Sequence, residues 1–118
     1  MGRKIVHLEI FADDRLETAR FYADLFGWEV QDYADMSYTM LNTPNQEMGI
    51  GIGQRTAEQP GMTTFYIESE DLQADLEAIK AKGGQVVVEP MDVPGVGSMA
   101  FFTDPSGNIM ALGKFDNM

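Results

Sequence analysis

The sequence predicts an α+β fold that is built from two tandem copies of one βαβββ module. The first observation is an internal repeat, because one fixed offset places Asp14 on Asp71 and Gly27 on Gly84. The second is that both copies run through the same signals in the same order: an alternating strand, an acidic helix cap, an amphipathic helix and a glycine stop. The third is that short turns join the remaining strands, which favours antiparallel hairpins over a doubly wound parallel sheet.

The composition is typical of one globular domain over residues 1–118, with 44% hydrophobic and 23% charged residues. No apolar run approaches the roughly 20 residues that a membrane helix needs, and no secretory signal is visible. The lack of cysteine excludes disulfides and thiolate chemistry and fits a cytoplasmic protein. A net charge of −11 argues against nucleic acid or an anionic membrane as partner, because both require a basic face.

The first module is predicted over about residues 4–53. Its opening stretch, 4–11, alternates apolar and polar side chains, which predicts a half-buried strand. Asp14 is the expected N-cap of the following helix and Gly27 its expected stop. The apolar residues of that helix are Leu16, Ala19, Phe21, Tyr22, Leu25 and Phe26. Three further strands are expected, at 28–35, 37–41 and 48–53.

Residues 54–61 are polar and contain a proline, so they are expected to link the modules. The second module is predicted over about 62–115, where Asp71 caps a helix with apolar residues at i, i+4 and i+7. Strands are expected at 63–68, 85–91, 98–103 and 109–114. The segment DPSGN, residues 104–108, is assigned to turn chemistry, since aspartate starts such turns, proline fixes φ and glycine adopts a positive φ.

Together these features resemble the glyoxalase / bleomycin-resistance / extradiol-dioxygenase superfamily, also called vicinal oxygen chelate proteins. The resemblance rests on His7 in the first strand, on the cap-to-helix passage 13–28, and on the passage 94–115 with its DPSGN turn. It covers essentially the whole chain. It implies a cup-shaped mixed sheet with the helices outside and a ligand cavity within. Many members hold a divalent metal in that cavity through the first and last strands of each module.

The resemblance also implies where the metal ligands would stand. His7 fits its place, but Thr64, Ala111 and Ile50 occupy the other three, where the family's metal-dependent members carry stronger ligands. Catalytic divalent metals usually keep at least three protein ligands. We therefore expect an incomplete site and no metal cofactor, with a divalent metal held by non-standard ligands as the alternative.

His7, the only histidine, and Glu9 are the candidate catalytic residues, and strand alternation places both on one face. His7 is open to three roles: a cavity-facing base or hydrogen-bonding group, a metal ligand, or a structural histidine. Glu9 either orients the imidazole or works with it in acid–base chemistry, or it is a solvated surface carboxylate or a partner at an interface. Tyr66 either contacts the ligand or fills the core. The expected ligand-binding residues are Phe11, Ile50, Ile52, Thr64, Tyr66, Phe101, Ile109 and Ala111.

Three classes of function follow. The leading hypothesis is a metal-independent small-molecule-binding protein, which resembles the drug-sequestering branch of the superfamily; for such binders the resemblance implies a homodimer as one assembly. The second is a glyoxalase-like lyase, isomerase or dioxygenase, with a metal completed by a partner chain or with acid–base chemistry alone. The third is an interaction or regulatory domain that retains a vestigial pocket.

Overall fold

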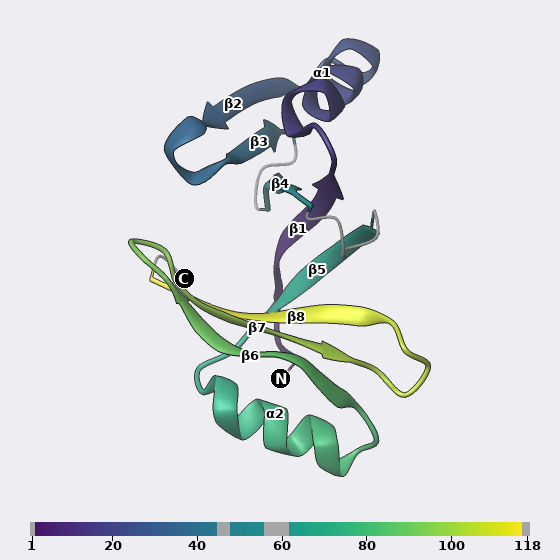
Figure 1. Cartoon of the computed structure of the whole chain (residues 1–118), viewed down its shortest axis with the longest axis vertical. Helices are drawn as coiled ribbons and strands as arrows, with labels where there is room; N and C mark the ends of the chain where they lie inside the picture. The colour runs from purple at the N-terminus through teal and green to yellow at the C-terminus, as the bar shows by residue number, and fades with distance from the viewer. Residues whose placement is uncertain (1, 45–47, 56–61, 117–118) are drawn as a thin grey trace. The chain divides into compact units, whose positions relative to one another are not determined.

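The computed structural model describes residues 2–44, 48–55 and 62–116, and the chain divides into two compact units (Figure 1). His7–Thr64 make up the N-terminal unit, while residues 2–6 and 65–116 belong to the C-terminal unit. The order strand, helix and three strands occurs twice along the chain, as the internal repeat predicted. Within the described ranges, neither helix has the length and apolar character needed to cross a membrane.

The N-terminal sheet has the strand order β2-β3-β4-β1. Strand β1 runs parallel to β4, while β3 is antiparallel to both β2 and β4. The first two residues of β1 group with the C-terminal unit, where the carbonyl of Lys4 accepts a hydrogen bond from the Glu68 backbone. The elements are β1 (Ile5–Ala12), α1 (Arg15–Phe26), β2 (Glu29–Tyr33), a 3-10 turn (Ala34–Met36), β3 (Tyr38–Asn42) and β4 (Ile50–Gln54).

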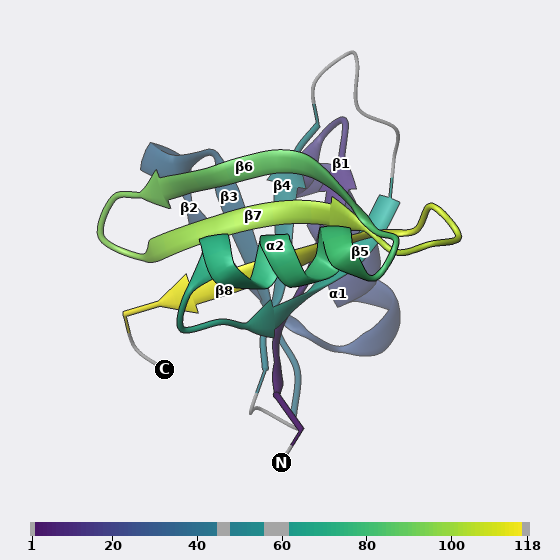
Figure 2. The same cartoon turned by 90° about the horizontal axis from the view of Figure 1, so that it is seen from below.

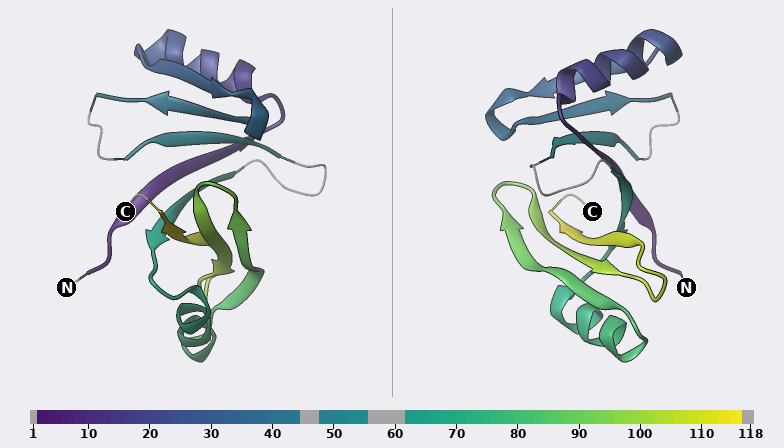
Figure 3. Two further views of the ribbon diagram at one scale, coloured as in Figure 1. Left: turned by 90° about the vertical axis from the view of Figure 1, so that its left-hand side faces the viewer. Right: turned by 45° about the vertical axis from the view of Figure 1, so that its right-hand side comes forward.

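Helix α1 begins and ends where the sequence predicted. The Asp14 carboxylate accepts a hydrogen bond from the Glu17 backbone N–H at 3.0 Å, which satisfies one of the donors left open at a helix start. Gly27 ends the helix with φ of 75°, a left-handed conformation that costs glycine little, and its N–H donates to the carbonyl of Ala23. Figures 1 and 3 show α1 lying along one face of the N-terminal sheet.

The core of the N-terminal unit lies between α1 and this sheet. Ala19 of the helix packs against Leu41 of β3 and Ile52 of β4, all three fully buried. Because side chains alternate along a strand, the opposite face carries the odd-numbered residues of β1 and β4. The candidate site is built on that opposite face.

The C-terminal sheet has the order β5-β8-β7-β6, with β5 parallel to β8 and the other neighbours antiparallel. Helix α2 starts at Asp71, whose carboxylate accepts from the Ala74 backbone at 3.0 Å, and lies along one face of this sheet (Figure 2). Residues 62–64 of β5 group with the N-terminal unit. The elements are β5 (Met62–Glu68), α2 (Leu72–Ala81), β6 (Gln85–Val93), β7 (Gly97–Thr103) and β8 (Ile109–Phe115).

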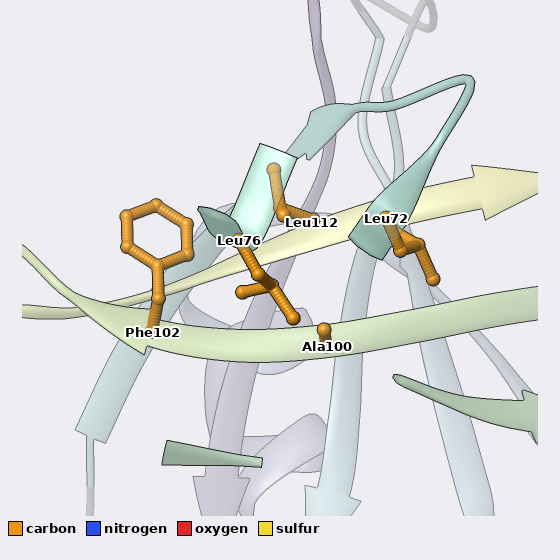
Figure 4. Packing of buried hydrophobic residues seen from close by; sticks show 5 residues of the cluster. All are labelled: Leu72, Leu76, Ala100, Phe102 and Leu112. Carbon is orange, nitrogen blue, oxygen red and sulfur yellow. The ribbon is translucent and has the colours of Figure 1, made fainter. Parts of the chain in front are cut away.

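Apolar side chains from three elements fill the core of the C-terminal unit. Helix α2 contributes two leucines, and strands β7 and β8 contribute the residues facing them (Figure 4). The five buried members of the cluster are Leu72, Leu76, Ala100, Phe102 and Leu112.

Two strand boundaries differ from the sequence prediction for clear reasons. The first hairpin contains a 3-10 turn at Ala34–Met36, after which Ser37 adopts φ of 50°, so β2 ends earlier than predicted. Strand β6 continues to Val93 through Pro90. Proline is tolerated there because β6 is the last strand in its sheet and its register with β7 shifts between Val88 and Met91.

Candidate functional site

Three side chains on the sheet face opposite α1 form a continuous hydrogen-bonded group, the His7–Tyr38–Glu9 cluster. The Tyr38 hydroxyl donates to Oε2 of Glu9 at 2.6 Å and lies 2.6 Å from Nε2 of His7. Nε2 of His7 and Oε2 of Glu9 are themselves 3.9 Å apart. Only 17% of the His7 side chain and 8% of the Glu9 side chain are exposed, so all three polar groups meet in a mostly dry environment.

Strand β4 makes room for this cluster by presenting glycines on that face. Gly51 lies opposite Glu9 in the β1–β4 pairing. A Cβ atom at Gly51 would lie 1.7 Å from the Tyr38 hydroxyl oxygen and 2.8 Å from Nε2 of His7. Both distances are far below normal contact, so the phenol can occupy its place only because residue 51 has no side chain. The glycine at position 51 of the alternating GIGIG segment is therefore a structural requirement of the cluster.

Burial determines the charge state of the imidazole. Desolvation lowers the pKa of His7 from 6.5 to about 4, because the buried environment disfavours the imidazolium. His7 is then neutral at pH 7, and its 3.9 Å approach to Glu9 is not an ion pair at that pH. A neutral histidine next to a carboxylate and a phenol can accept or donate a proton within one hydrogen-bonded group.

The donor set of this face does not fit a divalent metal centre. Nε2 of His7 and Oε2 of Glu9 both already make short hydrogen bonds to Tyr38. Gly51, the β4 residue across from Glu9, has no side chain to offer a metal. Within residues 2–44, 48–55 and 62–116, no three His, Cys, Asp or Glu side chains are grouped as metal ligands. A catalytic divalent metal usually needs at least three protein ligands.

The structure separates the predicted binding residues of the N-terminal unit onto two faces. The Phe11 ring lies on the cluster side, where a Cβ at Gly53 would contact it at 3.6 Å. Ile52 is fully buried in the core beneath α1, and Ile50 packs against the same core. Both isoleucines therefore face the helix and not the cluster, because they alternate with the glycines along β4. Thr64 is buried, with 1% of its surface exposed.

The four candidates in the C-terminal unit share the face of their sheet opposite α2. Tyr66 of β5 is buried and lies across from Ala111 of β8. Its ring packs against Phe101, with ring centroids 5.9 Å apart, and against Phe115 at 5.7 Å. Ile109 occupies the same side of β8, two residues before Ala111. This face is apolar and aromatic, and Tyr66 is buried among its rings, which agrees with the core-filling role considered for it.

Sequence reasoning identified His7 and Glu9 as a pair on one face but missed Tyr38, which joins them. Tyr38 comes from β3, and the register places β3 and β1 on either side of β4. A signal for it does exist in the sequence. The alternating glycines leave one face of β4 without side chains, so large side chains from the flanking strands must cover it. Tyr38 and Phe11 are such side chains.

Comparison with known proteins agrees with this architecture. Residues 4–112 match the family model described as "Glyoxalase/Bleomycin resistance protein/Dioxygenase superfamily". Among solved structures, a hypothetical protein of Bacillus halodurans superimposes with a TM-score of 0.70 over 97% of this chain and 95% of its own, at 16% identity. The likeness confirms the α+β fold of two βαβββ modules.

Two curated relatives are considerably longer than this chain. An anthracycline biosynthesis protein of Streptomyces peucetius is 29% identical over 88% of the chain. A putative lactoylglutathione lyase of Brassica oleracea var. gemmifera is 31% identical over 93% of it. In both cases the matched region makes up 44% of the relative, so the chain spans about half the length of these proteins.

Proposed function

The chain belongs to the glyoxalase / bleomycin resistance protein / dioxygenase superfamily, and from that premise we propose that it is a metal-independent small-molecule-binding protein. Its ligand contacts the His7–Tyr38–Glu9 cluster and the adjoining ring of Phe11. The polar cluster orients the ligand, while aromatic surface supplies contact area, which is the usual division of labour in ligand sites.

One observation carries this proposal: the Tyr38 phenol occupies the space between His7 and Glu9 above a glycine. This arrangement uses the two strongest potential metal ligands of the face in hydrogen bonds to a tyrosine. It leaves a neutral imidazole and a carboxylate in a mostly buried position, where hydrogen bonds to a ligand gain strength from the low local dielectric.

The names of the relatives suggest the first ligands to test, an anthracycline and lactoylglutathione. We expect calorimetry to detect binding of at least one panel member to protein dialysed against a chelator, and elemental analysis to find no bound metal. His7→Gln should weaken that binding about tenfold, as expected for one lost hydrogen bond worth about 1.4 kcal/mol. Glu89→Gln, an exposed change in β6, is the matched control and should bind normally.

A different outcome would be equally informative. Near-stoichiometric divalent metal that disappears in His7→Gln, together with loss of ligand binding on chelation, would contradict a metal-independent site. Absence of binding by every panel member, in folded protein, would favour the interaction-domain class. A homodimer and a cytoplasmic location are further expectations of the proposal, and sedimentation and cell fractionation test them.

A lyase or isomerase is the second candidate, and the cluster itself favours it. Imidazole, phenol and carboxylate in one hydrogen-bonded chain are groups that perform general acid–base catalysis. The similarity to a putative lactoylglutathione lyase gives the substrate to try. Turnover by chelator-treated protein, lost in both His7→Gln and Glu9→Gln, would place this candidate first; binding without turnover would leave the binding protein ahead.

A further inference from the structure

We infer that Tyr38 is the positioning residue of this site: by giving its only proton to Glu9, it fixes His7 as the neutral tautomer that carries its proton on Nε2. Sequence reasoning did not assign Tyr38 any role. The inference deepens the proposed function, because it specifies which nitrogen of the imidazole is the donor and which is the acceptor.

The direction of each hydrogen bond follows from counting protons. A phenol has one proton, and the Tyr38 hydroxyl donates it to the Glu9 carboxylate at 2.6 Å. The same oxygen can then only accept from its second neighbour. Nε2 of His7 lies 2.6 Å from that oxygen, so Nε2 must carry a hydrogen to make this contact favourable. In a neutral imidazole the other nitrogen, Nδ1, then carries the lone pair.

The opposite arrangement is chemically distinct. It would place a proton on Glu9, which would donate to Tyr38, and Tyr38 would donate to Nε2, leaving the proton of His7 on Nδ1. One consideration favours the first arrangement. Hydrogen bonds to an ionised carboxylate are shorter and about twice as strong as neutral ones, and the bond from Tyr38 to Glu9 is short.

Gly51 leaves the space that the phenol of Tyr38 occupies. Because a Cβ there would lie 1.7 Å from the hydroxyl oxygen and 2.3 Å from Cζ, the side chain of Tyr38 passes directly over the bare backbone of β4. The Tyr38 and His7 rings are tilted by 30° with centroids 6.2 Å apart, so they meet through their polar tips and not by stacking. A glycine at position 51 is thus needed for Tyr38 to reach both His7 and Glu9.

The test uses ligand-free protein, so its result does not depend on whether a ligand is ever found. His7 is the only histidine, so a long-range ¹H–¹⁵N correlation spectrum of uniformly labelled protein shows one imidazole without ambiguity. At pH 7 we expect the two ring nitrogens to show the pattern of a neutral ring with the proton on Nε2. An Nδ1–H pattern, or an even mixture of the two tautomers, would overturn the inference.

Two variants remove the phenol contact by independent routes. Tyr38→Phe deletes the hydroxyl and keeps the ring, whereas Gly51→Ala forces the phenol away. In Tyr38→Phe the Glu9 carboxylate, already 3.9 Å from Nε2 in the parent, can accept a hydrogen bond from the imidazole directly, which favours the charged form of histidine. We therefore expect the pKa of His7, followed by the same spectra, to rise by about one unit or more in Tyr38→Phe. In Gly51→Ala the new Cβ would also lie 2.8 Å from Nε2, so the imidazole is displaced as well and its signals should differ from those of the parent.

Each variant has a matched control. Tyr33 pairs with Tyr38 across the β2–β3 hairpin but is exposed, so Tyr33→Phe should leave the imidazole unchanged. Gly53 lies on the same face of β4, but a Cβ there would have ordinary contacts from 3.6 Å. Gly53→Ala should therefore also leave the imidazole signals and the pKa of His7 unchanged. A folded Tyr38→Phe protein with the parent's His7 pKa would show that the hydroxyl only fills space. An equal rise in Gly53→Ala would show a general loosening of β4.

Discussion

His7 links the stability of the chain to pH, and the sign of that link follows from its burial. Its pKa is about 4 in the folded protein and 6.5 as the ordinary value, so the unfolded chain binds a proton there more readily. The stabilising contribution of neutral His7 is fully present above pH 6.5 and is lost as the pH falls from 6.5 to 4. Over that window the loss amounts to about 3 kcal/mol of unfolding free energy.

Urea unfolding at pH 7 and at pH 4.5 measures this effect. We expect the parent protein to lose more stability between the two pH values than His7→Gln, which has no group titrating there. The difference between the two proteins isolates His7 from carboxylates such as Asp75, whose pKa is lowered by its hydrogen bond to Arg3. Equal losses in both proteins would show that the imidazole is not buried in its neutral form.

At the scale of single residues, the sequence could identify only what local alternation determines. His7 and Glu9 were placed together because residues two apart share a strand face. Tyr38 was missed because its contact with His7 depends on β3 and β1 flanking β4, a register that no local pattern specifies. Ile52 was assigned to the cavity although it alternates with Gly51 and faces α1.

The two helix starts are the elements whose local chemistry is most directly testable. Asp14 and Asp71 each accept one backbone N–H of the first helical turn at 3.0 Å. Asp14→Ala and Asp71→Ala should each cost about 1 kcal/mol of unfolding free energy, measured by thermal or urea unfolding. Asparagine at either position keeps an acceptor oxygen, so Asp14→Asn and Asp71→Asn should retain most of the unfolding free energy that alanine removes. Equal destabilisation by asparagine would assign the effect to charge rather than to capping.

The order of elements could be predicted because each boundary depends on neighbouring residues alone. The DPSGN turn is an example: the Asp104 carboxylate accepts from the Asn108 side-chain amide at 2.9 Å and from the Asn108 and Ser106 backbones at 3.0 and 2.9 Å, and these bonds lower its pKa. Burial along α1 was harder to foresee. Phe21 and Leu25 were counted in its apolar face, but they are 57% and 61% exposed, since small Ala19 makes the close contact with the sheet.

At the scale of the whole molecule, the repeat predicted the fold class but not the exact extent of each unit. The first module was expected to begin near residue 4, whereas residues 2–6 group with the C-terminal unit. The reason lies in contacts distant in sequence. Arg3 pairs with Asp75 of α2, and the Lys4 backbone N–H donates to the Glu68 carboxylate at 2.8 Å. These partners are far apart in the sequence and meet only in the folded chain, so no periodic pattern in the sequence indicates them.

The net charge of −11 is also a property of the whole molecule, and it predicts how stability responds to salt. With 19 acidic against 8 basic residues, the folded chain concentrates mutually repelling charges. Raising NaCl shortens the screening length from about 10 Å at 0.1 M to about 3 Å at 1 M, which weakens this repulsion. The same salt weakens exposed ion pairs, but such pairs contribute only about 0–1 kcal/mol each.

We therefore expect the unfolding midpoint in thermal melts to rise between 0.1 and 1 M NaCl, since the repulsion involves many charges and the exposed ion pairs are few in the part of the chain that the structure describes. The midpoint of Glu89→Lys should rise less over the same range of NaCl, because reversing one exposed charge in β6 changes the net charge from −11 to −9. The midpoint of Glu89→Gln should rise by an amount between those of the parent and Glu89→Lys. A midpoint that falls with NaCl in all three proteins would mean that ion pairs such as Arg3–Asp75 and Arg15–Asp32 outweigh the net repulsion.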